Sequence, residues 1–253
     1  MALHPILQKI ISTKESEVNQ ISDSFVLTPK KNNFYDSLQK KIPFVIAECK
    51  KASPSSGTIR DSYDPVVIAK TYEDCGAACI SVLTDSKYFS GSTEDLRNVV
   101  SEVTVPVLRK DFIIDTKQIA EALSLGASAV LLIVRILSDS QLKDFYQYSE
   151  SLGLGVLFEI HTLEELDRIL PLKPKAIGIN TRDLDTFAMH PNLISEIAPK
   201  IPEGILRIAE SGIHSSKDIE SHLPFVDGFL IGSYFMKSSN LSEAYRNLFP
   251  EKG

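Results

Sequence analysis

Side chains that can donate or accept protons stand at the ends of several apolar runs in this sequence. The clearest case is Ile205-Leu-Arg-Ile-Ala-Glu-Ser-Gly-Ile213, which ends in a carboxylate, a hydroxyl and a glycine. An isolated charge inside an apolar core costs several kcal/mol unless it is paired or hydrated, so charges confined to strand ends predict one solvent-reachable site. The residues that end these runs are Glu48, Lys50, Lys110, Glu159, Asn180, Glu210 and the pair Gly232-Ser233.

The ionisable members of this set have both signs. Carboxylates and ammonium groups around one pocket shift each other's pKa values and suit acid–base catalysis. The alternative is a structural network of ion pairs that closes one end of the fold. Glu48 and Lys50 are two residues apart, so on a strand they face the same side and Cys49 faces the other. We therefore expect Cys49 to be a buried packing residue and not a nucleophile.

Two short glycine-containing turns predict a phosphate site. Ser211-Gly212 and Gly232-Ser233 each follow an apolar run and precede a helical stretch. Glycine lets backbone N–H groups approach an anion closely, and a helix N-terminus adds partial positive charge. Either dipeptide alone is ordinary turn chemistry, but two of them at neighbouring strand ends favour phosphate binding.

The pattern of apolar runs predicts eight strands that alternate with helices, which is typical of a closed (β/α)8 TIM barrel. The length of 253 residues fits one such domain, since these barrels take about 250 residues. An open doubly wound sheet is the alternative, but Ala52-Ser-Pro-Ser-Ser-Gly57 is not its glycine fingerprint. We expect strands near 44–49, 78–83, 105–109, 128–134, 154–159, 175–179, 205–210 and 226–231, with intervening helices at 64–75, 93–102, 116–125, 138–152, 162–170, 191–198 and 215–223 and a final helix at 238–249.

Two helices are expected ahead of the first strand. Residues 5–21 carry an apolar stripe that starts after Pro5, and residues 33–40 form a shorter helix with Asn33 as its cap. We therefore divide the single domain, 1–253, into an N-terminal helical extension (1–43) and the barrel (44–249). No composition break suggests a second domain.

Charge and composition exclude several classes of protein. The net charge of −6 leaves no basic surplus to neutralise nucleic-acid or membrane phosphates. No run of about 18 apolar residues or export signal occurs. The three cysteines and five histidines lack metal-ligand spacing, so we expect no metal. These features predict a cytoplasmic protein that acts on a small molecule, without nucleic acid or membrane, as a monomer or weak homo-oligomer.

The order and spacing of seven motifs resemble the indole-3-glycerol phosphate synthase family across residues 4–249. The resemblance implies a TIM-barrel lyase of tryptophan biosynthesis that converts 1-(2-carboxyphenylamino)-1-deoxyribulose 5-phosphate into indole-3-glycerol phosphate, carbon dioxide and water without a cofactor. It also implies that the N-terminal helices pack over the barrel mouth. The motifs are Glu48-x-Lys50-x-x-Ser53-Pro54, Thr84-Asp-Ser-Lys-Tyr-Phe-Ser-Gly-Ser92, Arg109-Lys-Asp-Phe-Ile113, Phe158-Glu159, Ile179-Asn-Thr-Arg-Asp-Leu184, Ala209-Glu-Ser-Gly-Ile213 and Leu230-Ile-Gly-Ser233.

The resemblance also implies a role for each site residue. Lys110 resembles the general acid that protonates the substrate carbonyl, and Glu159 and Glu48 resemble the carboxylates of the later proton transfers, with Lys50 assisting. Asn180 and Glu210 resemble the groups that orient the substrate and the lysines. The implied phosphate-binding and substrate-contacting residues are Ser53, Arg182, Ser211, Gly212, Gly232 and Ser233, and the implied apolar slot for the aromatic ring consists of Phe112, Leu184 and Phe89.

Several features of the site stay open at the level of sequence. A lysine that donates a proton near neutral pH should have a lowered pKa, which burial and the nearby Lys50 would produce. Burial would raise the pKa of Glu159, and a nearby lysine would oppose that rise. Ser90 stands where many relatives carry an amide side chain. His161 follows Glu159 by two residues, which would put it on the same side, but we expect a histidine in a loop to face solvent.

Three alternative functions remain. A phosphoribosylanthranilate isomerase-like barrel would share the phosphate site but use a cysteine and an aspartate as its acid–base pair. A Schiff-base aldolase would use one of the strand-end lysines as a nucleophile. A non-catalytic phosphate-binding barrel would have no need for the full set of acids and bases.

Overall fold

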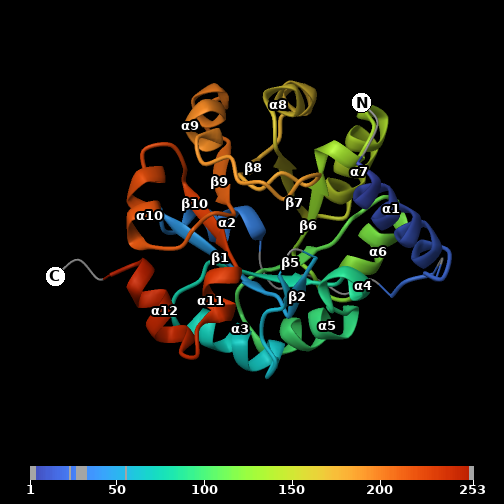
Figure 1. Cartoon of the computed structure of the whole chain (residues 1–253). Helices are drawn as coiled ribbons and strands as arrows, with labels where there is room; N and C mark the ends of the chain where they lie inside the picture. Colours follow the sequence, from blue (N-terminus) through green and yellow to red (C-terminus); the bar gives the residue numbers. More distant parts are fainter. Residues whose placement is uncertain (1–3, 23, 27–32, 55, 251–253) are drawn as a thin grey trace.

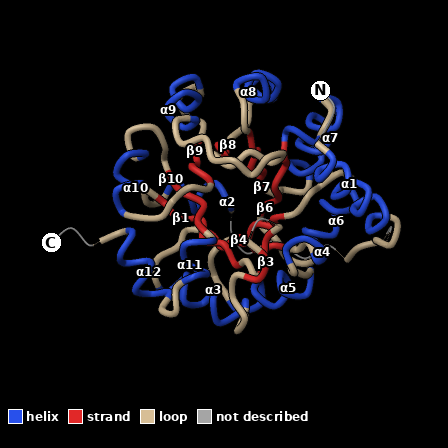
Figure 2. Tube along the Cα trace, viewed as in Figure 1, coloured by secondary structure: helices blue, strands red, loops and turns tan. Residues whose placement is uncertain are grey.

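The computed structural model, which describes residues 4–22, 24–26, 33–54 and 56–250, is a closed barrel of parallel strands inside a ring of helices (Figures 1 and 2). The order around the barrel is β1-β10-β9-β8-β7-β6-β5-β4, so each strand pairs with its neighbours in the chain and β10 closes onto β1. This confirms the predicted (β/α)8 architecture. The barrel strands are β1 Phe44–Cys49, β4 Cys79–Leu83, β5 Val107–Lys110, β6 Ala129–Ile133, β7 Gly155–Ile160, β8 Ala176–Asn180, β9 Leu206–Glu210 and β10 Gly228–Ile231.

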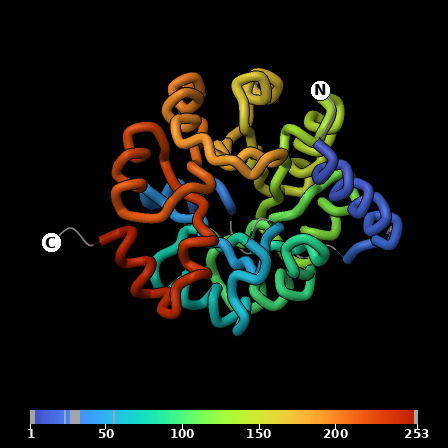
Figure 3. The backbone as a smooth tube through the Cα atoms, in the orientation of Figure 1, coloured from blue at the N-terminus to red at the C-terminus, as the bar shows by residue number. Residues whose placement is uncertain are grey.

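The helices follow the strands around the ring, and the colours of Figure 3 run from blue to red in that order. Most begin at a side chain that accepts hydrogen bonds from the first turn. Asp115 and Ser138 form capping boxes with Gln118 and Gln141. The ring comprises α3 Pro65–Asp74, α5 Thr93–Glu102, α6 Thr116–Ser124, α7 Asp139–Ser151, α8 Leu163–Ile169, α9 Leu193–Ile197, α10 Ser216–His222 and α12 Leu241–Leu248.

The predicted strands and ring helices are all present, with ends that shift by up to three residues. The sequence analysis missed the short elements, because a four- or five-residue helix has no measurable periodicity. In β5 the predicted start at 105 was early, and the strand extends through Lys110. The missed elements are the hairpin strands β2 Ala52–Ser53 and β3 Gly57–Thr58, the helices α4 Ser86–Phe89 and α11 Ser233–Lys237, and the 3-10 turns η1 Val134–Ile136, η2 Leu170–Leu172 and η3 Ala198–Lys200.

Alternation along each strand separates two apolar layers. In β1, Val45 and Ala47 pack against the outer helices, whereas Phe44 and Ile46 pack inside the barrel. The same parity continues to the strand ends, where the next inward position is polar. The packed interior is therefore closed at its carboxyl end by charged side chains.

The two helices of the N-terminal extension lie at opposite ends of the barrel. Helix α1, Pro5–Val18, contacts the loops after β4 and β5, where Lys14 pairs with Asp85 and Asp111. Helix α2, Phe34–Gln39, packs at the amino ends of the strands, with Phe34 against Gly155 at the start of β7. The expected cover over the mouth thus holds for α1 and is wrong for α2. No helix in the described ranges is both long and apolar enough to span a membrane.

Candidate active site

The strand register brings the predicted ionisable residues to one end of the barrel interior. Glu48 continues the inward positions of Phe44 and Ile46, and Lys110 follows the inward Leu108. Glu159, Asn180 and Glu210 occupy the equivalent position at the ends of β7, β8 and β9. Their side chains are almost completely buried, and Glu48, Glu159 and Glu210 are only 1–2% exposed. The shared parity explains why residues far apart in sequence meet here.

A single pocket at this end brings together every predicted site residue. It also contains residues that the sequence analysis did not single out, among them Asp85, Phe187, His214 and Tyr234. Ser90, whose place in the loop was open, does not line it. The predicted residues that line the pocket are Glu48, Lys50, Ser53, Phe89, Lys110, Phe112, Glu159, Asn180, Arg182, Leu184, Glu210, Ser211, Gly212, Gly232 and Ser233.

Lys110 lies at the centre of the charged set. Its Nζ is 2.9 Å from Glu159 Oε2 and 3.3 Å from Glu210 Oε2. The other oxygen of Glu159 accepts a hydrogen bond of 3.1 Å from Asn180 Nδ2. Asn180 is oriented in turn by the backbone N–H of Arg182, which donates to its Oδ1 at 3.0 Å. An ammonium group therefore bridges two buried carboxylates, and an amide fixes one of them.

These charges shift the pKa values in opposite directions. Burial would lower the pKa of Lys110, but Glu159, Glu210 and Glu48 outweigh it and raise that pKa above its ordinary value. Burial favours neutral Glu159, yet Lys110 and His161 lower the pKa of that carboxyl. Burial raises the pKa of Glu210 to about 8; Lys110 opposes this only in part, and Glu159 adds to the rise. These shifts favour the charged forms of Lys110 and Glu159 and the neutral form of Glu210.

The expected lowering of the Lys110 pKa is therefore wrong. The expectation assumed that Lys50 would be the dominant neighbour of Lys110. Lys50 instead pairs with Glu48, with 2.5 Å between Nζ and Oε1. Glu48 fits against the backbone of Gly232, where a Cβ atom would overlap its carboxylate. Gly232 thus makes room for a carboxylate as well as ending β10.

The turns predicted to bind phosphate lie side by side at the ends of β9 and β10. Ser211 and Gly212 both have left-handed backbone conformations, with φ values of 66° and 74°. Gly232 is the residue before α11, which begins at Ser233. Ser53 comes from β2 in the loop after β1 and lines the same pocket. These backbone turns and hydroxyls form a polar side of the pocket.

Apolar side chains from three strand-end loops form another part of the pocket lining: Phe89 after β4, Phe112 after β5 and Leu184 after β8. The rings of Phe89 and Phe112 have centroids 6.1 Å apart and an interplanar angle of 42°. Leu184 packs against the same interior cluster as both rings. Asp85 accepts hydrogen bonds from the N–H groups of Tyr88 and Phe89 and so fixes the helix that carries Phe89. The pocket has the polar and apolar regions that the predicted substrate requires.

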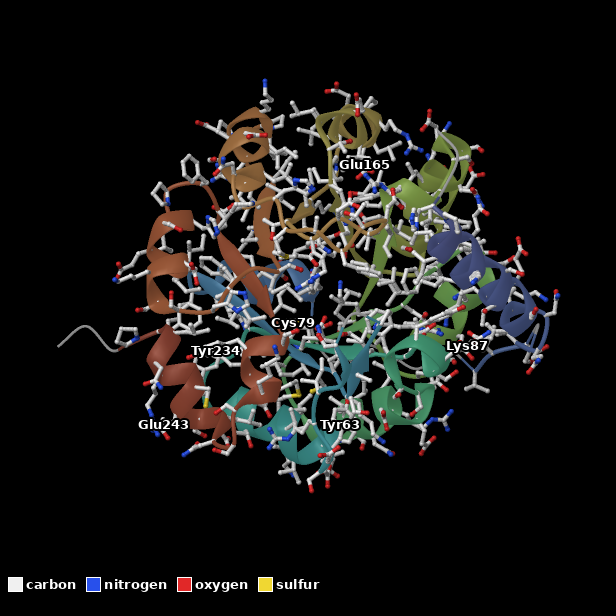
Figure 4. The ribbon with its side chains drawn as sticks, viewed as in Figure 1. Tyr63, Cys79, Lys87, Glu165, Tyr234 and Glu243 are labelled. Carbon is white, nitrogen blue, oxygen red and sulfur yellow. The ribbon has the colours of Figure 1, made fainter. Side chains whose placement is uncertain are left out.

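Lys14 supports this part of the site and was missed in the sequence. Its side chain is 1% exposed, and Nζ lies 2.8 Å from Asp85 Oδ2 and 2.9 Å from Asp111 Oδ1. Nearby, Lys87, labelled in Figure 4, donates to Thr13 of α1. Lys14 shares the buried stripe of α1 with Leu7, Ile10 and Val18, and a lysine within an apolar stripe is the signal that could have identified it.

His161 is a second residue that sequence reasoning misjudged. It was expected to face solvent, but it is 5% exposed. It continues the inward parity of Glu159 one step beyond the end of β7. Its Nε2 lies 3.4 Å from Glu159 Oε1. A buried imidazole therefore lies directly beside the central carboxylate.

The structure also bears on the cysteine alternative. Cys49 packs in the layer between strands and helices, its thiol is 3.9 Å from the Pro65 carbonyl oxygen, and it does not line the pocket. Burial raises the pKa of this thiol, so the neutral form is favoured. The isomerase-like alternative, which needs a cysteine acid–base group, loses its support.

Comparison with known proteins identifies the family. A family model described as indole-3-glycerol phosphate synthase matches residues 7–248. An indole-3-glycerol phosphate synthase of Leptospira interrogans is 49% identical over 246 residues, with 97% of this chain and 98% of that protein covered. One of Aquifex aeolicus is 46% identical over 252 residues, with 96% of each covered.

Solved structures of lower similarity share the fold alone. KGPDC from Streptococcus mutans superposes with a TM-score of 0.63 at 13% identity and covers 82% of this chain and 96% of its own. Thiamine phosphate pyrophosphorylase from Pyrococcus furiosus superposes with a TM-score of 0.61 at 16% identity and covers 85% and 96%. The family model and the identities of the synthases, taken with the pocket, show that this chain belongs to the indole-3-glycerol phosphate synthase family.

Proposed function

We propose that this chain is a decarboxylating lyase that closes the indole ring in tryptophan biosynthesis. It converts 1-(2-carboxyphenylamino)-1-deoxyribulose 5-phosphate into indole-3-glycerol phosphate, carbon dioxide and water. The observation that carries this proposal is the bridge of Lys110 between Glu159 and Glu210 inside a pocket with a phosphate side and an aromatic side. We also propose that the chain is one domain, 1–253, which consists of an N-terminal extension, 1–43, and a barrel, 44–249.

Lys110 is the proposed general acid. As the ring carbon of the substrate attacks the ketose carbonyl carbon, a C–C bond forms and the carbonyl oxygen takes a proton from Nζ. The raised pKa of Lys110 keeps that proton in place until the substrate arrives. Glu210, protonated at neutral pH and 3.3 Å away, is a source from which Lys110 can regain a proton. Lys110 thus donates the proton to the substrate, and Glu210 returns a proton to Lys110.

Glu159, Glu48 and Lys50 are assigned the later steps. Loss of carbon dioxide returns its bonding electrons to the ring, and loss of the hydroxyl as water requires one proton on the oxygen and removal of another from the substrate. Glu159 is charged and can accept a proton. Glu48 and Lys50 are paired at 2.5 Å and form a second donor and acceptor pair. They stand at the end of β1, across the barrel from Glu159 on β7.

The two ends of the pocket position the substrate. The phosphate would bind between the turns at Ser211-Gly212 and Gly232-Ser233, with Ser53 and Arg182 as further contacts. The aromatic ring would lie among Phe89, Phe112 and Leu184. Ring closure needs the ring carbon and the carbonyl to meet, and anchoring both ends favours that folded conformation.

The cellular location, partners and oligomeric state of the enzyme are also proposed. We propose that it acts in the cytoplasm on this small phosphorylated substrate, without a cofactor or metal and without nucleic acid or membrane. We further propose a monomer or weak homo-oligomer. Sedimentation of the purified chain at several concentrations would test the oligomeric state.

The test of the function is direct conversion of the substrate. The purified chain is incubated with the carboxyphenylamino-deoxyribulose phosphate, and indole fluorescence and released carbon dioxide are followed. The proposal requires indole-3-glycerol phosphate and carbon dioxide in equal amounts. A chain that binds the substrate without releasing carbon dioxide would be the non-catalytic alternative, and borohydride trapping of a lysine adduct would instead indicate the aldolase alternative.

A further inference from the structure

His161 lies on the barrel side of β7 between two carboxylates, outside the set of residues assigned above. Nε2 is 3.4 Å from Glu159 Oε1, and Nδ1 is 3.5 Å from Glu165 Oε2. The side chain is 2% exposed, so water does not surround it. Within the described part of the chain neither ring nitrogen has a partner at ordinary hydrogen-bond geometry. Buried polar atoms are normally hydrogen-bonded, so an imidazole buried between two carboxylates without such bonds is unusual.

Glu165 holds the far side of the ring. It lies in the first turn of α8 and is labelled in Figure 4 on the side of that helix facing the barrel. One oxygen accepts the backbone N–H of His161 at 2.6 Å, and the other pairs with Arg135 Nε at 3.0 Å. Glu165 is therefore fixed at both oxygens, and its carboxylate lies beside Nδ1 while Nε2 lies on the side of Glu159.

The other edge of the imidazole ring, which carries Nε2, faces the carboxylate of Glu159. Lys110 contacts Oε2 of Glu159, whereas Asn180 and His161 face Oε1. In the proposed reaction Lys110 turns its proton toward the substrate carbonyl, and Glu159 then loses part of its strongest ion pair. Asn180 and His161 are the groups that stay with the carboxylate at that moment.

We infer that His161 is a positioning residue, whose Nε2 proton closes onto Glu159 Oε1 when Lys110 turns toward the substrate and then holds Glu159 in the orientation and charged form that proton acceptance requires. This inference rests on the proposed function. The alternative is that His161 only fills the space between Glu159 and Glu165. The two differ in their effect on the pH dependence of turnover, since filling space affects stability alone.

A matched pair of variants separates these cases. His161→Gln keeps an N–H donor at the distance of Nε2, and His161→Met has similar length without a donor. Loss of the donor should lower kcat by up to about 10²-fold with little change in KM, since misplacement of a catalytic group by about 1 Å costs that much. The glutamine variant should retain kcat within about 10-fold of the wild type. His222→Gln, at the half-buried end of α10 and outside the pocket, is the control.

The pH profile of kcat gives the readout that a space-filling residue would not move. The acidic limb reports the charged form of Glu159, which faces Lys110, Glu210, Asn180 and His161, with Glu48 close to Lys110 and Glu210. On the other side the imidazole faces Glu165, backed by Arg135. His161 lowers the pKa of Glu159, so in His161→Met the acidic limb should move to higher pH.

Different results overturn the inference about His161 and the proposed function. If both variants keep the wild-type kcat and pH profile and differ only in thermal unfolding, or if glutamine is as poor as methionine, the inference is overturned. If the methionine variant does not fold, a glutamine variant slower than the wild type by more than about 10-fold overturns it. A wild type that forms no product would instead reject the proposed function, whatever the variants do.

Discussion

The carboxylate of Glu210 fits against the backbone of Gly178 on the neighbouring strand. A Cβ atom at Gly178 would overlap Glu210 Oε1, because Gly178 is an inward position of β8 just below the pocket. The contact leaves Glu210 Oε2 at 3.3 Å from Lys110 Nζ. The glycine therefore supplies the space in which the protonated carboxyl beside Lys110 sits.

Gly178→Ala should displace Glu210 from Lys110. The side chain of Glu210 is 2% exposed, so a displaced carboxyl would stay inside the buried cluster around Lys110. We expect kcat to fall by about 10²-fold, since a shift of about 1 Å in a catalytic group has that effect. Steady-state assay of indole formation measures it.

The double variant Gly178→Ala, Glu210→Ala supplies the control. When the carboxylate is gone, the added methyl group has nothing to overlap, so the double variant should be no slower than Glu210→Ala alone. Independent, additive losses would mean that Gly178→Ala acts elsewhere in the barrel.

The fold and the gathering of these residues in one pocket could be predicted because both depend on local order. The inward parity of a strand is readable from two apolar residues, as in Phe44 and Ile46, and it places Glu48 at the mouth. Parallel strands in alternation with helices bring their carboxyl ends together whatever their distance in sequence. For this reason Lys110 and Glu210 could be assigned to one pocket before any distance was known.

The charge states could not be predicted, since they depend on which partner is nearest. Lys50 was expected to lower the pKa of Lys110, but it pairs with Glu48. His161 was expected in solvent because it follows a strand, although the residue two positions earlier already faced inward. The location of α2 at the amino end was missed because an amphipathic helix does not indicate which face of a barrel it covers.

As pH rises from about 4.5 to about 8, the titration of Glu210 should lower the stability of the protein. In the unfolded chain this carboxyl loses its proton near 4.5, whereas in the folded chain burial raises its pKa to about 8. Between those values the folded state binds more protons, so the free energy of unfolding decreases as pH rises, by up to about 1.4 kcal/mol per pH unit. Glu210→Gln removes this titration, and urea unfolding at several pH values compares the two proteins.

Glu203→Gln, on the exposed turn before β9, is the control for this measurement. Its difference from the wild type should not change with pH over the same range. If the wild type and Glu210→Gln give parallel curves, then the carboxyl of Glu210 is already charged in the folded protein.

Arg60 should affect substrate binding more than turnover. Its guanidinium donates to the carbonyl oxygens of Ser238 at 2.8 Å and Met236 at 3.4 Å, and so ties the loop after β1 to the end of α11. That loop carries Ser53, one of the proposed phosphate contacts. Charged hydrogen bonds contribute about 1.5–3 kcal/mol, so Arg60→Ala should raise KM by about 10-fold or more with a smaller change in kcat.

Arg97→Ala is the matched control for Arg60. Arg97 lies on α5 with its side chain 65% exposed, and its contact with Glu94 is 3.9 Å. It should leave both kinetic constants unchanged. An Arg60→Ala variant with the wild-type KM would show that the loop after β1 is held without this residue.

Lys14→Met should destabilise the protein and disturb the aromatic side of the pocket. Methionine has similar length but leaves Asp85 and Asp111, both buried, without the ammonium that pairs them. Removing one partner of a buried ion pair costs about 3–5 kcal/mol, because the remaining charge stays desolvated. Urea unfolding of Lys14→Met measures the loss, and Lys9→Met on the exposed face of α1 should change stability by less than about 0.5 kcal/mol. Adding Asp85→Asn to Lys14→Met should recover part of the loss, since the second change removes one of the unpaired charges. A double variant less stable than Lys14→Met would show that the hydrogen bonds from Tyr88 and Phe89 to the Asp85 carboxylate outweigh the cost of its unpaired charge.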